Sequence, residues 1–291
     1  MNTTMNTVNQ TFDWSRFTAA LRKELVENKR AILFTLLGTF GMLTMIMILG
    51  NISVSTNTDA SNAIKESLEC YLPQKMVYAF LSFAILIVAS LAFRKLTSKT
   101  GRIEMFTSPS STLEKFLVNA LIYVIGYLVA FFICTQLADL TRIAVLWPFR
   151  GDDMIVPGPI NFLTAIPDAV EGMGFGSAAP GKPSTWLTIN MFIGLLGGPG
   201  LFLLGSILWP RLSLLKTFAV VYGIQTIFGI TIMILDANIS DMEAVGDWVM
   251  DHLEHIMMAM TIISALLTIL YWSLSWYLFK RKDVVSLKWW K

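Results

Sequence analysis

Charged side chains are scarce in this chain of 291 residues: Asp, Glu, Lys and Arg make up 14% of it, against roughly 25% in an average soluble domain. Hydrophobic residues supply 55%, and the mean hydropathy is +0.62. A soluble fold of this length needs more polar surface, so most of the chain is expected to face lipid or other lipid-embedded helices. The net charge of +2 gives no sign of nucleic-acid binding.

Cysteine and histidine are equally rare, with two of each. Cys70 and Cys134 form neither a disulfide framework nor a metal site, and a single bridge between them is the minor alternative. His252 and His255 are three residues apart, so they share a helix face and could ligate a metal. Without a third histidine or cysteine, a solvated helix face is the preferred interpretation, and no metal or cofactor is expected.

Six apolar stretches are long enough to cross a bilayer, which takes about 20 residues. They are residues 31–50, 76–93, 116–137, 186–209, 217–235 and 256–279. None of the six contains Asp, Glu, Lys, Arg or His. Carriers coupled to protons or ions need buried titratable groups, so energy for any transport is expected to come from another polypeptide.

Lysine and arginine collect on alternate flanks of these stretches, which sets the expected orientation. Most lie before residue 31, between 94 and 115, at 211–216 and after 279. The opposite flanks hold only Lys65, Lys75, Arg142, Arg150 and Lys182. The sequence therefore predicts an all-α integral membrane protein, a single transmembrane domain of six helices with both termini cytoplasmic.

The predicted external loop over 138–185 is rich in proline and expected to be irregular. Residues 176–183 nearly match the sequence motif of a phosphate-binding loop, but Pro183 occupies the position at which the motif requires a Ser or Thr that ligates Mg²⁺. Nucleotide binding there is not expected. In the fourth stretch, glycines crowd around Pro199. Close helix packing is the preferred interpretation of these glycines, and a hinge is the alternative.

Residues 12–29 show the spacing of an amphipathic helix. The apolar face carries Trp14, Phe17, Leu21 and Leu25, and the polar face carries Arg22, Lys23, Glu24 and Glu27. Because this segment runs directly into the first span, it is predicted to lie in the cytoplasmic membrane interface. A soluble cap helix is the alternative.

The cytoplasmic loop at 94–115 has a defined local pattern. Ser111 and Glu114 form a capping box immediately before an apolar run, and Pro109 ends whatever precedes it. The pattern predicts a short helix, a turn and then a sharply started membrane helix. We interpret the loop as a docking surface, with a solvated connector as the alternative.

These two cytoplasmic segments and the six-span plan resemble the membrane subunit of an ABC-2 type transporter, in a form similar to Bacteroidota permeases. The helix containing Leu21, Arg22, Lys23, Glu24 and Leu25 looks like the elbow helix of that family. The segment before the third span is similar to the family's proline-serine turn and short helix. That segment is Glu104, Met105, Phe106, Thr107, Ser108, Pro109, Ser110, Ser111, Thr112 and Leu113.

The resemblance implies that residues 104–113 contact a separate ATP-binding subunit. ATP hydrolysis in that partner would drive a homodimer or heterodimer of permeases in the bacterial inner membrane, surrounded by lipid. The chain itself would then carry no catalytic residue. Two other classes stay open. One is a sensor or assembly factor acting through its external loops, and the other is a membrane enzyme with a site built around His252, His255 and the acidic external loop at about 236–255.

Overall fold

The computed structural model describes residues 12–55, 62–149, 156, 158–159, 185–238 and 252–282, which form helices and no strand. Five of the helices are long and apolar enough to cross a membrane. They are Lys29–Ile52, Thr112–Phe149, Ile189–Leu208, Ser213–Thr231 and Glu254–Lys280. The second predicted span corresponds to a shorter apolar helix, Met76–Ser90. The all-helical prediction is thus confirmed with five candidate spans, and the sixth stays a prediction.

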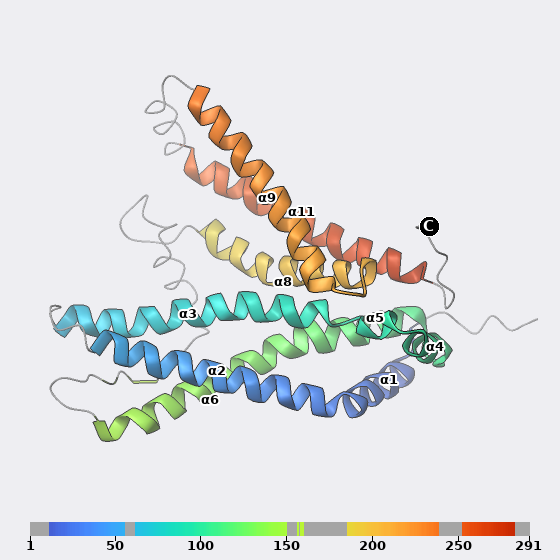
Figure 1. Ribbon diagram of the computed structural model, residues 1–291, viewed down its shortest axis with the longest axis horizontal. Helices are drawn as coiled ribbons and strands as arrows, with labels where there is room; N and C mark the ends of the chain where they lie inside the picture. Colours follow the sequence, from blue (N-terminus) through green and yellow to red (C-terminus); the bar gives the residue numbers. More distant parts are fainter. Residues whose placement is uncertain are drawn as a thin grey trace, which may run out of the picture.

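The long helices form two groups (Figure 1). The first contains α2 (Lys29–Ser55), α3 (Asn62–Ser90) and α6 (Tyr127–Leu146). The second contains α8 (Thr185–Leu208), α9 (Ser213–Asn238) and α11 (Leu253–Lys280). Contacts between α3 and α8 join the groups. A core that includes Leu43, Leu81, Phe131 and Phe202 fills the space between these helices.

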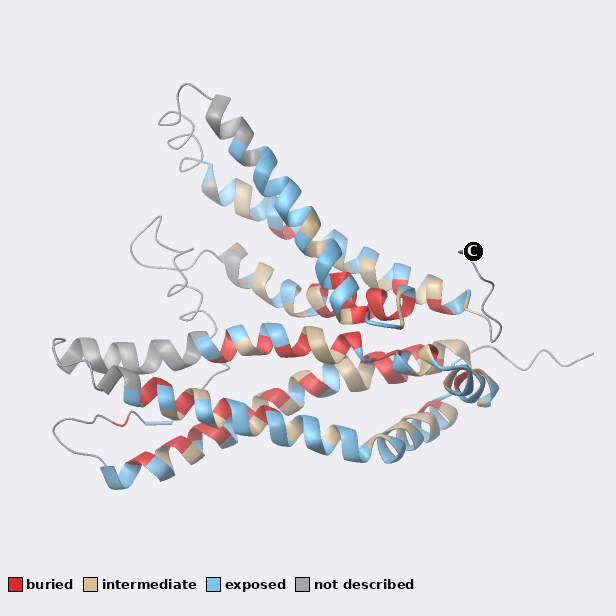
Figure 2. Cartoon of the chain, in the orientation of Figure 1, coloured by how far each residue is buried: buried red, intermediate tan, exposed pale blue. Residues whose placement is uncertain are grey.

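Burial is uneven between the two groups (Figure 2). Buried residues follow the facing sides of α2, α3, α6 and α8, whereas most of α9 and α11 is exposed. Large apolar side chains stand out from α9, including Ile227 at 67% exposure and Met233 at 73%. A helix that is apolar all round requires an apolar environment, as lipid or another apolar chain provides.

Short elements gather at one end of the long helices, called here the α1–α4 end (Figure 1). They are α1 (Trp14–Glu27), η1 (Arg94–Thr97), α4 (Lys99–Thr107) and α5 (Thr112–Ala120). The π-helical segment η2 (Leu121–Gly126) joins α5 to α6 in one continuous helical rod. The predicted second span reaches Phe93, but α3 ends at Ser90 and the chain tightens through a turn into η1.

One predicted boundary is wrong. The sequence placed the end of the third span at Leu137 and an external loop from residue 138, but α6 continues to Leu146 and a 3₁₀ turn, η3 (Trp147–Phe149), follows. The charges that marked a loop are buried in the bundle: Asp139 and Arg142 are each 1% exposed. They lie three apart on α6 and pair with each other, so the helix continues. Most of the remaining predicted loop, including the stretch 176–183, lies outside the described residues.

The glycines of α8 lie where other helices approach closely. A Cβ on Gly200 would lie 2.7 Å from Trp272 Nε1 of α11, and one on Gly197 would lie 2.6 Å from Thr268 Oγ1. On Gly205 it would collide with Thr217 of α9. These contacts support the packing interpretation of the glycine-rich stretch.

Candidate functional site at the α1–α4 end

Helix α1 starts with a side-chain cap. The Asp13 carboxylate accepts hydrogen bonds from the backbone N–H groups of Ser15 at 2.7 Å and Arg16 at 3.3 Å. Phe17 is buried and lies against Phe12 and Trp14, while Trp14 itself is 68% exposed. The helix predicted over 12–29 is therefore present, with an apolar face that the rest of the described chain covers only in part.

Helix α4 begins at a similar cap. The Ser98 hydroxyl accepts the N–H of Gly101 at 3.0 Å. A Cβ at Gly101 would collide with the carbonyl oxygen of Lys95, so this position requires glycine. Met105 turns inward and is buried, whereas Ile103 and Thr107, one turn apart, are exposed. The helix thus presents one face to the molecule and one away from it.

The turn after α4 is fixed by polar contacts. The hydroxyls of Ser108 and Ser110 lie 2.8 Å apart, and Lys115 Nζ donates to the Ser108 carbonyl at 3.0 Å. The predicted capping box is present in both directions: Glu114 N–H donates to Ser111 Oγ at 3.2 Å, and Ser111 N–H donates to Glu114 Oε2 at 2.8 Å. The predicted order of short helix, turn and sharply started helix is confirmed.

Glu114 does more than cap its own helix. Its side chain is fully buried, and Oε1 accepts the backbone N–H of Asp13 at 2.9 Å. The Arg16 guanidinium lies 3.3 Å from the same oxygen. One carboxylate therefore fixes the start of α1 to the start of α5, a role that a capping motif alone does not reveal.

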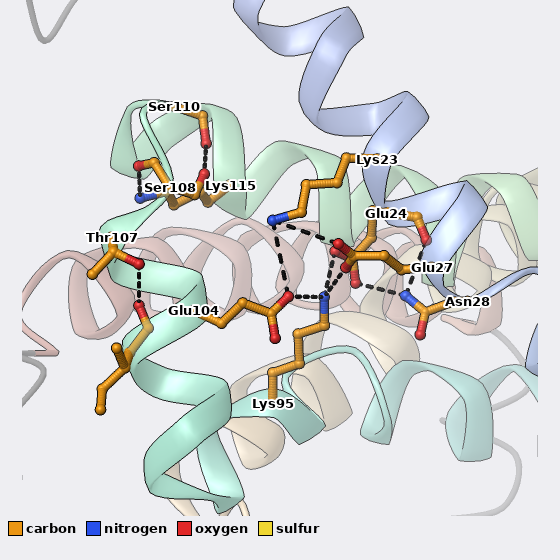
Figure 3. Close-up of polar contacts among 11 residues, drawn as sticks. Lys23, Glu24, Glu27, Asn28, Lys95, Glu104, Thr107, Ser108, Ser110 and Lys115 are labelled. Atoms are coloured by element: carbon orange, nitrogen blue, oxygen red, sulfur yellow. Dashed lines mark hydrogen bonds and ion pairs between the residues drawn. The ribbon is translucent and has the colours of Figure 1, made fainter.

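A charge network joins α1 to η1 and α4 (Figure 3). Lys95 Nζ lies 2.8 Å from Glu24, 3.0 Å from Glu27 and 3.7 Å from Glu104. Lys23 lies 3.5 Å from Glu27 and 3.9 Å from Glu104. The sequence placed Lys23 and Glu24 on an outward polar face with Arg22, but these two side chains turn toward η1 and α4.

The network shifts the pKa values of Lys95 and Glu27. Burial alone would lower the pKa of Lys95, but the hydrogen bonds that its ammonium donates to Glu24 and Glu27 outweigh burial and raise that pKa above its ordinary value. For Glu27, burial acts to raise the pKa, and contacts with Lys95 and Lys23 turn the net shift downward. Both shifts favour the charged forms, so Lys95 and Glu27 stay ionised at neutral pH.

Aromatic rings anchor α4 from the other side. The ring centroid of Phe93 lies 5.9 Å from that of Phe116, in a stacked arrangement, and 4.8 Å from that of Phe279, in a tilted one. Phe106 of α4 lies 6.1 Å from Phe279, and Trp276 lies edge-on to Phe116 at 5.5 Å. These rings connect the turn after α3, α4, the start of α5 and the end of α11. Helix α4 is thus held between a charge network and an aromatic cluster.

A second polar cluster lies at the opposite end, on α6. Arg142 Nε donates to Asp139 at 2.8 Å, Nη1 donates to Asn51 of α2 at 2.9 Å, and Nη2 donates to the Gly158 carbonyl at 3.2 Å. Arg142 and Asn51 are almost fully buried. The sequence missed this cluster because Asn51, the partner that makes burial tolerable, is distant along the chain.

The other candidate residues do not assemble into a site among the described residues. The rings of His252 and His255 have centroids 6.5 Å apart, and both side chains are exposed. No third His, Cys, Asp or Glu within the described ranges joins them. Cys134 is buried in the core, whereas the Cys70 side chain lies outside the described residues, as does the acidic segment 239–251.

Comparison of the chain with family models, with curated proteins and with solved structures gives no match. The interpretation of this site therefore depends on the residues and contacts described above.

Proposed function

We propose that this chain is the membrane subunit of an ABC-2 type exporter. In this proposal six helices span the bacterial inner membrane, both termini are cytoplasmic, and the α1–α4 end faces the cytoplasm. A separate ATP-binding subunit hydrolyses ATP, and the chain supplies no catalytic residue. It pairs with a second permease, identical or homologous, to form the transport path.

The observation that carries the proposal is the outer face of α4. Lys99, Ile103 and Thr107 follow at intervals of four, so they lie on one face, and all three are exposed. The opposite face is fixed by Met105 and Phe106, which pack into the aromatic cluster. A short helix with one exposed face and the opposite face packed against the protein is suited to bind a partner and to transmit the partner's movement to the long helices.

The charge of this face supports an acidic partner. Lys99 and Arg102 of α4 and Lys282 after α11 form no side-chain ion pair with any described residue. Burial lowers the pKa of Lys282, and the nearby positive charge of Arg102 lowers it further. A carboxylate from a docked protein would offset that repulsion.

The exposed helices support the remaining parts of the proposal. On α9, side chains such as Phe228 and Ile224 have more than half of their surface exposed. Such faces are stable against lipid or against a second permease. Both partners are therefore part of the proposed assembly.

Co-purification tests this function directly. The full chain is co-expressed with a soluble ABC ATP-binding protein encoded beside its gene and captured through a tag on the chain. We expect the ATP-binding protein to be retained and its ATPase rate to depend on the chain. Ile103→Asp is expected to abolish retention, because it replaces the apolar side chain of this face with a charge that repels an acidic partner.

Leu212→Asp is the matched control. Leu212 is 67% exposed and lies between α8 and α9 at the same end. The proposal predicts normal retention with this variant. Equal retention by the wild-type chain and Ile103→Asp would contradict the docking role of α4, and failure of the wild-type chain to retain any such ATPase would contradict the proposed function.

A further inference from the structure

A cavity of about 650 Å³ lies between the α1–α2 junction, the end of α3 and the π-helical segment η2. Its walls are mainly aliphatic, and they include Ile32 and Leu36 of α2, Val88 of α3 and Leu121 of η2. The volume lies within the range of small-molecule sites, about 300–1,000 Å³. Water does not fill an apolar cavity of this kind stably, so an apolar ligand suits it better.

The cavity opens sideways, between helices. Lining residues on both walls are exposed, among them Thr35 on α2, Leu91 after α3 and Gly126 on η2. Gly126 has no side chain to close the opening, and a Cβ there would lie 3.1 Å from the Leu121 carbonyl oxygen. In a bilayer such an opening faces lipid chains, and a long acyl chain can enter without crossing a polar layer.

The polar rim lies at the α1–α4 end and contains Glu24, Asn28, Arg94 and Lys95. Glu24 is already bound to Lys95 at 2.8 Å and accepts a hydrogen bond from Asn28 at 2.8 Å. Arg94 is exposed, and its side chain forms no hydrogen bond or ion pair with any described residue. Arg94 is therefore the cation at the rim that no described carboxylate pairs with, and a guanidinium binds a phosphate well.

We infer that this cavity binds one anionic phospholipid, with an acyl chain between α2 and η2 and the phosphate at Arg94. The bound lipid fills the space between α1–α2 and the α5–α6 rod, and so supports the base of the charge network. The inference requires that the helices lie in a bilayer. It does not require the transport function, because a lipid site of this kind would also exist in a sensor.

The test uses the full-length chain, purified in detergent and stripped of lipid. It is then mixed with phosphatidylglycerol or phosphatidylcholine of the same chain length, and bound lipid is measured by native mass spectrometry. We expect the wild-type chain to retain phosphatidylglycerol about fivefold better than phosphatidylcholine, the preference that one cation near an anionic headgroup provides. Arg94→Gln is expected to remove the preference, while Lys216→Gln, which removes an exposed cation at the start of α9, keeps it.

Cavity-filling variants test the acyl chain separately. Ala130→Trp on the α6 wall and Ala31→Trp on the α2 wall place a large ring in the space, and both are expected to abolish retention of either lipid. Ala219→Trp, at an exposed position of α9, is the size-matched control and should bind as the wild-type chain does. Equal lipid binding by Ala31→Trp and Ala219→Trp would overturn the inference, as would equal retention of the two lipids by the wild-type chain.

Discussion

Replacing Glu114 with alanine tests the central claim about how the α1–α4 end is held together. The side chain is fully buried and accepts N–H groups from Ser111 and Asp13, with Arg16 at 3.3 Å. A hydrogen bond to a charged group contributes about 1.5–3 kcal/mol, so the two N–H contacts together contribute roughly 3–6 kcal/mol. The Arg16 pair adds little, because that side chain is 29% exposed and partly screened by solvent.

The buried carboxylate also has a desolvation cost, which the substitution removes. We therefore expect a net loss of about 3 kcal/mol, at the lower end of the values for breaking a buried charged contact. For a domain of this size that corresponds to a drop in Tm of roughly 6–12 °C. The measurement is thermal unfolding of the purified chain in a mild detergent, followed by tryptophan fluorescence.

Glu254→Ala is the matched control for this substitution. Glu254 also lies in the first turn of a helix, α11, but its side chain is exposed. Loss of its interaction with the helix dipole should cost about 0.3–1 kcal/mol, a Tm change of a few degrees at most. If Glu114→Ala and Glu254→Ala lowered Tm equally, the carboxylate would not join α1 to α5 in the way described.

Three further predictions follow from other contacts. Arg142→Ala should lower the free energy of unfolding by about 3–5 kcal/mol, because it leaves Asp139 buried without its cation. The double variant Asp139→Leu/Arg142→Met should recover most of that stability. Denaturation in detergent measures both variants. The pKa of Glu27 is lowered in the folded protein, so Glu27 stabilises the fold fully above its unfolded pKa of 4.5, and this stabilisation is lost as the pH falls through the folded pKa. The pKa of Lys95 is raised, so Lys95 stabilises the fold fully below its unfolded pKa of 10.5. The protection factors of the α1 amides, which are corrected for the intrinsic pH dependence of exchange, should therefore be constant between these values and fall at pH 3.5, and Lys95→Met should remove that acid dependence. Gly200→Ala should lower the free energy of unfolding by about 1–3 kcal/mol through the clash with α11. The same change at a glycine with open space around it should have no such effect. Equal unfolding temperatures for these two variants would contradict the packing argument.

The sequence predicts the helices better than it predicts where they end. Apolar runs locate the long helices, and the capping box at Ser111 and Glu114 locates the start of α5 to the residue, because a cap is a local contact. The end of α6 was missed for the opposite reason. The charges of Asp139 and Arg142 indicated a loop, because the sequence alone does not show that Asn51 lies beside Arg142. Asn51 and Arg142 are distant along the chain.

The same limit applies to the candidate site. Helical spacing correctly separates an apolar from a polar face on α1, but it cannot say what covers the polar face. Lys23 and Glu24 lie against η1 and α4 because Lys95 and Glu104 have complementary charges there. The π-helical segment was also not predicted, since its irregularity leaves no pattern in an apolar run.

The contacts at the α1–α4 end determine how a displacement of α4 would be transmitted to the long helices. Helix α4 touches α1 through the charge network and α11 through the aromatic rings, and α1 continues through Asn28 directly into α2. The turn after α4 leads into α5 and then the continuous α5–α6 rod. Charge-assisted hydrogen bonds of this kind fix direction as well as distance. A partner bound to the outer face of α4 would therefore move α2, α6 and α11 together.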